Sequence, residues 1–235
     1  MIRTIAITVL SILGLTYAQT PPAYRFVPCD PVKQQTCQAM FNDQMGINAS
    51  LGIQSFLQLR QAIEQSFADY AADGLLSTCY AFKEFKGCFP QNPTNQYYAC
   101  AQDPLGLMID ANKTATGISR REAQGYTKIW NQLDFVCGAG FSYFANNDNC
   151  ASNIFNNRTG ELRNCDASLY ENIDRDPSQA CSYVSIAANC YQSIFWNACR
   201  KVELAWWGCN YERSGTQLQY PQCTQLWCTF HEILN

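Results

Sequence analysis

The side chains able to do chemistry in this sequence are fourteen cysteines, nineteen aspartates and glutamates, and a single histidine. Histidine changes its charge near neutral pH and is the usual proton carrier of secreted hydrolases. The only one here, His231, lies close to the C-terminus, and a nuclease mechanism that needs two histidines is excluded. We interpret His231 as a solvated tail residue. The sequence therefore predicts a protein that is not an enzyme.

The acidic residues keep one catalytic hypothesis open. A glycosidase mechanism needs only two carboxylates, so a carboxylate-dependent hydrolase is the third hypothesis for this chain. Glu203 is the one acid in a strongly apolar stretch, just before Trp206 and Trp207, where burial would raise its pKa. A polar position on an amphipathic helix is the simpler interpretation, because the sequence singles out no second acid beside it.

The sequence contains no pattern typical of a metal, cofactor or nucleic-acid site. No two cysteines have the Cys-x2-Cys spacing of a zinc site, and the closest pair is Cys223 and Cys228. Gly138 and Gly140 follow no predicted strand, so they indicate close helix packing rather than a phosphate loop. The formal net charge is −3 and the basic residues form no run, which disfavours nucleic acid. We predict no metal, no cofactor and no nucleic-acid partner.

Residues 1–18 have the form of a secretory signal peptide, with an uncleaved anchor as the alternative. Arg3 supplies a positive charge, an apolar run follows, and Thr16 and Ala18 are small residues that suit cleavage. The run is shorter than the roughly 20 apolar residues that cross a bilayer, and no later segment is apolar enough. The sequence predicts a secreted, extracellular domain over residues 19–235 with no membrane span.

An even number of cysteines in an exported chain predicts disulfide bonds rather than free thiols or metal ligands. Each bridge typically contributes about 2–4 kcal/mol, so several together rival the roughly 5–15 kcal/mol net stability of a domain. A chain of this length buries a core without them, so we interpret the bridges as reinforcement. Their pairing is left open. The predicted disulfide cysteines are Cys29, Cys37, Cys79, Cys88, Cys100, Cys137, Cys150, Cys165, Cys181, Cys190, Cys199, Cys209, Cys223 and Cys228.

Two further sequence features bear on the surface of an exported protein. Three Asn-x-Ser/Thr sequons, at Asn48, Asn112 and Asn157, predict N-glycosylation. The five tryptophans either fill the core, which is the simpler interpretation, or line a cavity or contact surface. These tryptophans are Trp130, Trp196, Trp206, Trp207 and Trp227.

The cysteines, acids and tryptophans are expected on helices, because apolar residues recur at steps of three or four and strand signals are sparse. One stripe runs from Ile53 to Tyr70, interrupted only by Arg60, and Gly74 follows as a stop. A second run covers residues 75–89 and ends at a proline-rich loop.

A middle helix begins at Ser119, which forms the pattern of a capping box with Glu122. Its apolar stripe extends from Tyr126 toward Phe144. Two glycines on the way, at positions 138 and 140, would each cost about 1 kcal/mol in a continuous helix. The sequence therefore leaves open whether this helix is unbroken to Phe144.

The last long helix is predicted from Asp176 to about Trp207, because it opens with an acidic cap and a proline. Cys181, Cys190 and Cys199 lie nine residues apart along it, so neighbours face opposite sides and the outer two are about 27 Å apart. None of the three can bond to another in a continuous helix. Each must reach a different element, which predicts a central and largely buried helix.

Cysteine spacings are similar in the two halves of the chain. The four cysteines from Cys37 to Cys100 are separated by 42, 9 and 12 residues, and the four from Cys150 to Cys209 by 40, 9 and 10. Such spacings also arise by chance in a chain rich in cysteine. The predicted fold is an all-α or nearly all-α, disulfide-rich helical bundle, with two related halves as a hypothesis. The corresponding pseudo-repeats are residues 29–110 and 130–228.

The segment 133–141, the asparagine-rich stretch 146–149 leading to Cys150, and the Cys-x8-Cys separations resemble a known group. They are similar to the secreted cysteine-rich domains of nematodes, particularly the chondroitin proteoglycan 4-type group. The resemblance implies an extracellular, non-catalytic helical protein, which in some members carries chondroitin. It makes Ser214, in the single Ser-Gly dipeptide, the candidate attachment site. A turn after the last helix is the simpler interpretation of that dipeptide.

The leading hypothesis for function is a secreted, non-catalytic glycoprotein that acts as an extracellular structural or interaction module. Its partner would be an unidentified extracellular protein or glycan. The alternative is an extracellular carrier of a lipid or other small apolar molecule in a helical cavity, because the helices are aromatic and charged residues make up only 15% of the chain.

Overall fold

The computed structural model describes residues 26–90 and 94–229, so the predicted signal peptide and His231 lie outside it. The described residues form helices joined by loops, with one isolated β-bridge between Ile109 and Ala115. The prediction of a disulfide-rich all-α fold is confirmed. The longer helices are α1 (Pro31–Met45), α2 (Phe56–Cys88), α4 (Arg120–Val136), α7 (Thr159–Arg175), α8 (Ala180–Cys199) and α9 (Val202–Gln217).

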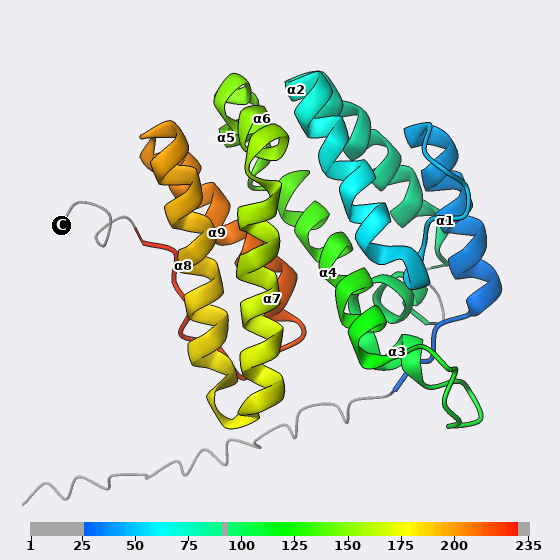
Figure 1. Cartoon of the computed structure of the whole chain (residues 1–235). Coiled ribbons are helices and arrows are strands. Elements are labelled where there is room, and N and C mark those ends of the chain that lie inside the picture. Colours follow the sequence, from blue (N-terminus) through cyan, green and yellow to red (C-terminus); the bar gives the residue numbers. More distant parts are fainter. Residues whose placement is uncertain (1–25, 91–93, 230–235) are drawn as a thin grey trace, which may run out of the picture.

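Shorter helices complete the chain and connect the long ones. In Figure 1, α4 lies in the middle, with α1 and α2 on one side and α6 to α9 on the other. Among the described residues, no helix is long and apolar enough to span a bilayer. The short helical segments are η1 (Ile53–Ser55), η2 (Tyr98–Gln102), α3 (Pro104–Met108), α5 (Phe141–Ala145), α6 (Asp148–Asn157) and η3 (Pro177–Gln179).

The central helix α4 begins where the sequence predicts. The Ser119 hydroxyl accepts a hydrogen bond from the Glu122 backbone N–H, and the Glu122 carboxylate accepts one from the Ser119 backbone N–H. This reciprocal pair satisfies two N–H groups that the first helical turn leaves free. The helix ends at Val136, before the turn that contains Gly138 and Gly140.

The break in α2 lies at Ala71 rather than at Gly74, so the predicted stop is wrong by three residues. Ala71 has a positive φ of 49°, and the two segments on either side fold back against each other (Figure 1). A β-carbon on Gly74 would lie 1.9 Å from the Ser66 carbonyl oxygen. Gly74 is therefore needed for the close approach of the two segments, and does not end the first one.

The predicted helix from Asp176 to Trp207 is also broken, at Arg200, whose φ is 51°. The chain turns back there, and α9 packs along α8 with Gly208 against the Phe195 ring. In α8 only eight of twenty residues are buried, whereas twelve of seventeen are buried in α4. The prediction of a central, buried last helix is thus wrong, because α4 occupies that place.

All fourteen cysteines form disulfides, as predicted. The three cysteines of α8 reach α6, α7 and the C-terminal segment, so the prediction that none bonds to another is confirmed. Two bridges, Cys37–Cys88 and Cys150–Cys199, join cysteines at corresponding places in the proposed halves, but the others do not correspond, and the duplication stays a prediction. The seven bridges are Cys29–Cys100, Cys37–Cys88, Cys79–Cys137, Cys150–Cys199, Cys165–Cys190, Cys181–Cys223 and Cys209–Cys228.

One face of α4 packs on a set of stacked rings from α1, α2 and the segment before η2. The Trp130 ring lies 3.9 Å from the Phe85 ring, nearly parallel to it, and meets the Phe41 ring edge-on at 5.0 Å. Such pairs add about 0.5–1.5 kcal/mol beyond the burial of their area. We call this set the aromatic core; its members are Phe41, Phe82, Phe85, Phe89, Tyr97, Tyr126 and Trp130.

Candidate functional site

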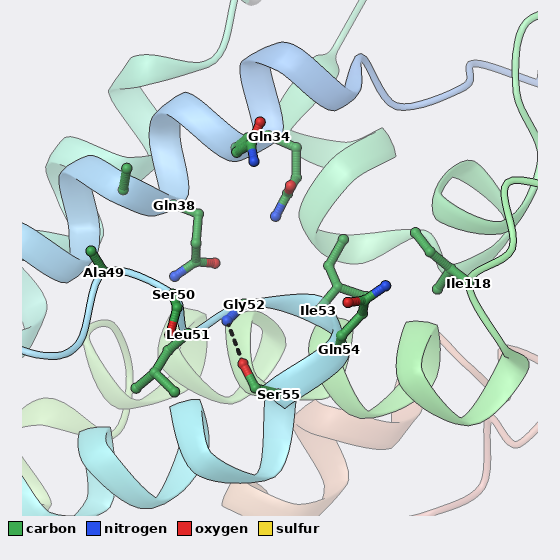
Figure 2. A pocket seen from close by; sticks show the side chains of 12 residues that line it. Gln34, Gln38, Ala49, Ser50, Leu51, Gly52, Ile53, Gln54, Ser55 and Ile118 are labelled. Carbon is green, nitrogen blue, oxygen red and sulfur yellow. Dashed lines mark hydrogen bonds between the residues drawn. The ribbon is translucent and has the colours of Figure 1, made fainter.

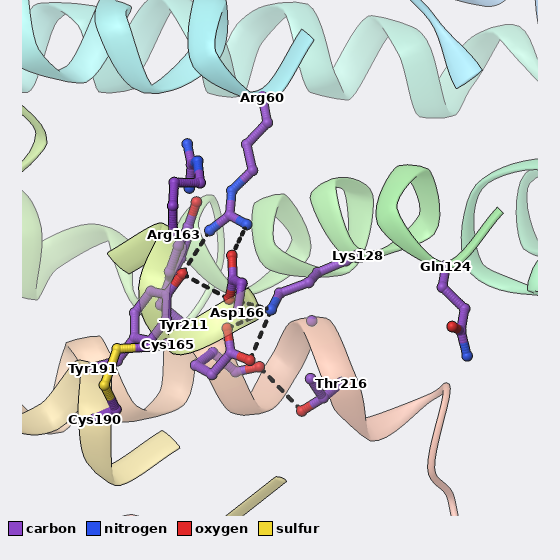
Figure 3. Close-up of polar contacts among 12 residues, drawn as sticks. Arg60, Gln124, Lys128, Arg163, Cys165, Asp166, Cys190, Tyr191, Tyr211 and Thr216 are labelled. Atoms are coloured by element: carbon purple, nitrogen blue, oxygen red, sulfur yellow. Dashed lines mark hydrogen bonds and ion pairs between the residues drawn. A yellow bond between two sulfur atoms is a disulfide. The ribbon is translucent and has the colours of Figure 1, made fainter. Parts of the chain in front are cut away.

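The densest group of ionisable side chains lies on the other side of α4, buried between α2, α7, α8 and α9 (Figure 3). Oppositely charged groups contact one another there, and two tyrosine hydroxyls join them. We call this group the charge cluster. Its members are Arg60, Glu64, Lys128, Arg163, Asp166, Tyr191, Tyr211 and Glu212.

Lys128 is the cation contributed by α4, and only 2% of its side chain is exposed. Its ammonium donates to Asp166 Oδ1 at 2.8 Å and to Glu212 Oε1 at 2.7 Å. Asp166 belongs to α7 and Glu212 to α9. One ammonium group therefore ties three helices together.

Arg60 connects the first segment of α2 to the same cluster. Its guanidinium donates to Glu64 at 2.9 Å, to Asp166, and to the Tyr191 hydroxyl at 2.8 Å. The Tyr191 hydroxyl in turn donates to Asp166 Oδ1 at 3.0 Å, and Tyr211 donates to Glu64 at 3.1 Å. The three nitrogens of the Arg60 guanidinium thus donate to three different partners.

A disulfide fixes the contact between α7 and α8 at this point. Cys165 bonds to Cys190, and each is the chain neighbour of a cluster residue, Asp166 and Tyr191. Figure 3 shows the bridge beside the two side chains. The covalent link therefore holds the hydrogen bond between the Tyr191 hydroxyl and Asp166 in place.

The charges in the cluster are balanced, which is the condition for burying them. Three cations, Arg60, Lys128 and Arg163, face three carboxylates, Glu64, Asp166 and Glu212. Removing a charge from water costs several kcal/mol per ion, and a paired geometry offsets that cost. Loss of any one partner would leave a buried charge without compensation.

The two carboxylates that share Lys128 have shifted pKa values in opposite directions. Burial alone would raise the pKa of Asp166, but the charges of Arg60 and Lys128 outweigh it and hold the pKa below its usual range. For Glu212, burial raises the pKa to about 7; the charge of Asp166 adds to this rise, and Lys128 opposes it. Asp166 contacts two cations, whereas Glu212 contacts only Lys128 and shares it with Asp166. The pKa is therefore lowered for Asp166 and raised for Glu212.

Two carboxylates with separated pKa values are what a general acid and base require. A general acid must also reach the substrate, and the Glu212 side chain has no exposed area. Its carboxylate is enclosed by Lys128 and by the helices that it links. The arrangement is therefore suited to fixing helices rather than to moving protons to a substrate.

A surface pocket lies directly beside the cluster, between α2, α4 and α7. Arg60, Lys128, Arg163 and Asp166 form part of its wall, and its volume is about 320 Å³. We call it the cationic pocket. With Arg121, which also lines the pocket, four of the five charged residues in this wall are positive.

A second pocket, of about 510 Å³, lies between α1 and the segment 49–55 (Figure 2). Tyr126 of α4 holds two polar side chains of its lining in place. The Tyr126 hydroxyl accepts a hydrogen bond from Gln34 at 2.8 Å and donates one to Gln38 at 2.6 Å. Gln38 also donates to Asn42 at 2.8 Å. The amide groups of this wall already bind one another, so they hold α1 on α4.

The three sequon asparagines all lie on the surface. Asn48 follows α1, Asn112 lies in the turn closed by the bridge at Ile109, and Asn157 is the last residue of α6. Their side chains are exposed, so glycans at these positions would meet solvent. Glycosylation itself stays a prediction.

Two other residues singled out from the sequence lie apart from the cluster. Ser214 is half-buried within α9, so the interpretation of Ser214-Gly215 as a turn after the last helix is wrong. Gly215 packs against Lys128, where a β-carbon would lie 2.7 Å from its side chain. Attachment of a glycosaminoglycan chain at Ser214 stays a prediction, and the acceptor serine would lie within a helix. Glu203 is exposed on α9, as expected for a polar helix position.

The tryptophans mostly fill space between helices. Trp130 and Trp207 are fully buried, and Trp207 stacks on Tyr211 at 5.0 Å. Trp206 is half-buried and lies 4.8 Å from the Tyr143 ring, so the neighbours at 206 and 207 divide between the edge and the interior of the core. Trp227 is 70% exposed. The buried rings thus contact one another rather than lining a cavity.

Sequence reasoning missed the charge cluster, although one signal pointed to it. Arg60 interrupts an otherwise apolar stripe, and a polar residue on the buried face of a helix needs a partner. The partners of Arg60 were not visible, because Asp166 and Tyr191 lie 106 and 131 residues away in the chain. Among the described residues, no group of three histidines, cysteines or acids is arranged to hold a metal ion.

Comparisons with known proteins identify no relative of this chain. No protein-family model, curated protein or solved structure matches the chain. The resemblance to chondroitin proteoglycan 4-type domains therefore stays a prediction.

Proposed function

We propose that this chain is a secreted, non-catalytic glycoprotein that acts outside the cell as a rigid structural or interaction module. The observation that carries the proposal is the pairing of all fourteen cysteines in seven bridges. Disulfides persist in oxidising compartments and are rare where thiols are kept reduced. They connect α1, α2, α7, α8 and α9 to other parts of the chain, and Cys137, directly after α4, bonds to Cys79 of α2. Such links suit a scaffold that must keep its shape outside the cell.

The charge cluster supports the non-catalytic part of the proposal. Its carboxylates are balanced by its cations, and its hydroxyl groups bind within the cluster. The carboxyl with the raised pKa, Glu212, is fully enclosed. Groups used in this way contribute to the relative placement of helices, and leave the exposed loops and sequons as the parts that meet a partner.

The carrier hypothesis is less well supported by the packing. It was motivated by the aromatic helices, and the largest buried rings pack against one another. Trp130 contacts Phe85, and Trp207 contacts Tyr211 and Phe195. A carrier for a large apolar ligand would need these rings to be separated.

Secretion of the full chain from eukaryotic cells tests the proposal. We expect the protein in the medium, with its mature N-terminus at Gln19, all cysteines bridged by non-reducing peptide mapping, and glycans at Asn48, Asn112 and Asn157. Retention of the chain inside the cell, or free thiols in the folded protein, would overturn the extracellular assignment.

The non-catalytic part has its own test. The secreted protein is assayed against a panel of glycosides and esters, beside the Asp166→Asn and Glu212→Gln variants. We expect no turnover by any of the three. If the unmodified chain hydrolyses a substrate and either variant does not, the hypothesis of a carboxylate-dependent hydrolase would be restored.

A further inference from the structure

The cationic pocket is formed by one face from each of three helices. On α7 the residues at positions 163, 166, 167 and 170 recur at steps of three, one and three, which places them on a single face. On α4 the lining positions 121, 125 and 128 follow the same rule, and α2 contributes its first turn. A pocket of about 320 Å³ is within the range that holds a small organic molecule.

The charges on its wall do not cancel. Four cations, Arg60, Arg121, Lys128 and Arg163, and one carboxylate, Asp166, line it. Figure 3 shows Arg60 and Lys128 reaching Asp166 from two sides, so these two are occupied within the cluster. Arg163 is balanced by Glu64, so the positive charge that remains for a ligand is that of Arg121, and Arg163 adds hydrogen-bond donors beside it.

Arg121 is the least committed of the four. It is exposed, forms no ion pair with any residue that the structure describes, and has its guanidinium 4.3 Å from the centre of the Tyr170 ring. The ring holds the guanidinium by a cation–π contact, and such a contact leaves the N–H donors at its edge unused. Arg121 is thus held at the pocket with donors available.

Arg163 lies on α7, about two helical turns before Tyr170. It donates to Glu64 from two of its nitrogens, and 28% of its side chain is exposed. A guanidinium carries five N–H donors, so this contact leaves donors for a second anion. Both arginines line the pocket and keep N–H donors that can form charge-assisted hydrogen bonds with a carboxylate or sulfate.

The rest of the wall is apolar. Phe56 and Leu57 form one side, and Ala167 and the Tyr170 ring form the other. Gly125 makes this possible, because a β-carbon there would lie 2.1 Å from the Phe56 ring. The pocket thus combines an apolar slot with cations at its rim, and an inorganic ion would leave the slot unused.

We propose that this pocket binds a small organic anion. Its carboxylate or sulfate group would lie on Arg121 and Arg163, and its apolar body would pack between Phe56, Leu57 and Tyr170. The proposal goes beyond the scaffold role and does not depend on it. It also differs from the carrier hypothesis, because the site is a surface pocket beside a charged cluster and requires a negative charge on the ligand.

Titration calorimetry on the oxidised full chain tests the proposal with three probes. Naphthalene-2-sulfonate has both required parts, naphthalene-2-sulfonamide lacks the full charge, and inorganic sulfate lacks the apolar body. We expect one site for the sulfonate, with affinity at least about tenfold higher than for either of the other two, which corresponds to about 1.4 kcal/mol. Equal affinity for sulfonate and sulfonamide would overturn the proposal.

Two matched substitutions locate the site. Arg121→Gln and Arg175→Gln remove the same charge from exposed arginines, but only Arg121 lines the pocket. We expect Arg121→Gln to weaken the sulfonate about fivefold, in the range of a partly exposed ion pair, and Arg175→Gln to leave it unchanged. Leu57→Ala should weaken the sulfonate and leave sulfate unchanged.

Amide NMR of the unmodified protein gives a readout that no variant can disturb. On addition of saturating naphthalene-2-sulfonate, the largest shifts should be those of the backbone resonances of Gly125 and Ala167. Shifts confined to another part of the chain, or equal losses in the two arginine variants, would show that the anion binds elsewhere and would overturn the proposal.

Discussion

The two faces of α4 pack against regions of opposite character. Trp130 faces the aromatic core, and Lys128, two residues earlier and therefore about 200° away around the helix, faces the charge cluster. Both side chains are buried almost completely. The aromatic core is stabilised by burial, which needs no particular partner. The cluster is stabilised only while each charge keeps its opposite.

Burial alone therefore does not determine how the stability of the protein responds to a substitution. The aromatic core should lose stability in proportion to the volume removed, at any pH. The charge cluster should respond strongly to loss of one charge and to titration. Two substitutions in the charge cluster and one in the aromatic core test this contrast.

The largest effect is expected from Lys128→Met. It leaves Asp166 and Glu212 without their common cation, and breaking a buried pair in this way typically costs about 3–5 kcal/mol. The control is Lys86→Met at the edge of the aromatic core, where Lys86 pairs with Asp134 and both are partly exposed. That pair should contribute about 0–1 kcal/mol. Urea unfolding at pH 7 measures both, and equal losses would remove the distinction between the regions.

An intermediate effect is expected from pH. The pKa of Glu212 is raised to about 7 in the folded protein, against 4.5 for an ordinary glutamate. The folded state thus keeps a proton that the unfolded state has lost, so the contribution of Glu212 to stability is fully present below about pH 4.5 and is lost as pH rises through about 7. The fall is on the order of 2–3 kcal/mol.

Glu212→Gln should abolish this fall, because glutamine does not titrate. Urea unfolding of both proteins between pH 5 and pH 8 makes the comparison. Asp166 titrates in the opposite sense, because its pKa is lowered, so its contribution is lost only at more acidic pH. A slope that persists in Glu212→Gln would assign the titration to another group.

The smallest effect is expected from Phe85→Leu in the aromatic core. It removes the ring that stacks on Trp130 and leaves a small cavity, which should cost about 1–2 kcal/mol. The cost should be the same at pH 5 and pH 8, because no ionised group contacts that ring pair directly. A pH-dependent cost would show that the two regions are coupled through α4.

Local patterns predicted much of the fold, for identifiable reasons. The capping box at Ser119 depends on residues three apart in the chain, and the helical stripes depend on neighbouring turns. The breaks at Ala71 and Arg200 were missed because ordinary residues adopt positive φ there. Glycine was the expected signal for such breaks, and at Gly74 it served close packing instead.

The charge cluster was beyond sequence reasoning because its partners are distant. Lys128 and Glu212 are 84 residues apart, and no local pattern relates them. The disulfide pairing was left open for the same reason, although helix geometry correctly excluded bonds among Cys181, Cys190 and Cys199. Geometry within one helix is predictable from spacing, whereas contacts between helices depend on the whole fold.

The bridge pattern has a consequence for a chain that is cut. Six of the seven bridges lie wholly within residues 29–100 or 150–228, and only Cys79–Cys137 links a cysteine of the first range to one beyond it, between the two ranges. Lys113 lies exposed in the loop between them, where proteases find accessible backbone. Cleavage after Lys113 would leave two fragments that migrate together until a reductant opens that single link. The covalent unity of the nicked protein thus depends on one bond.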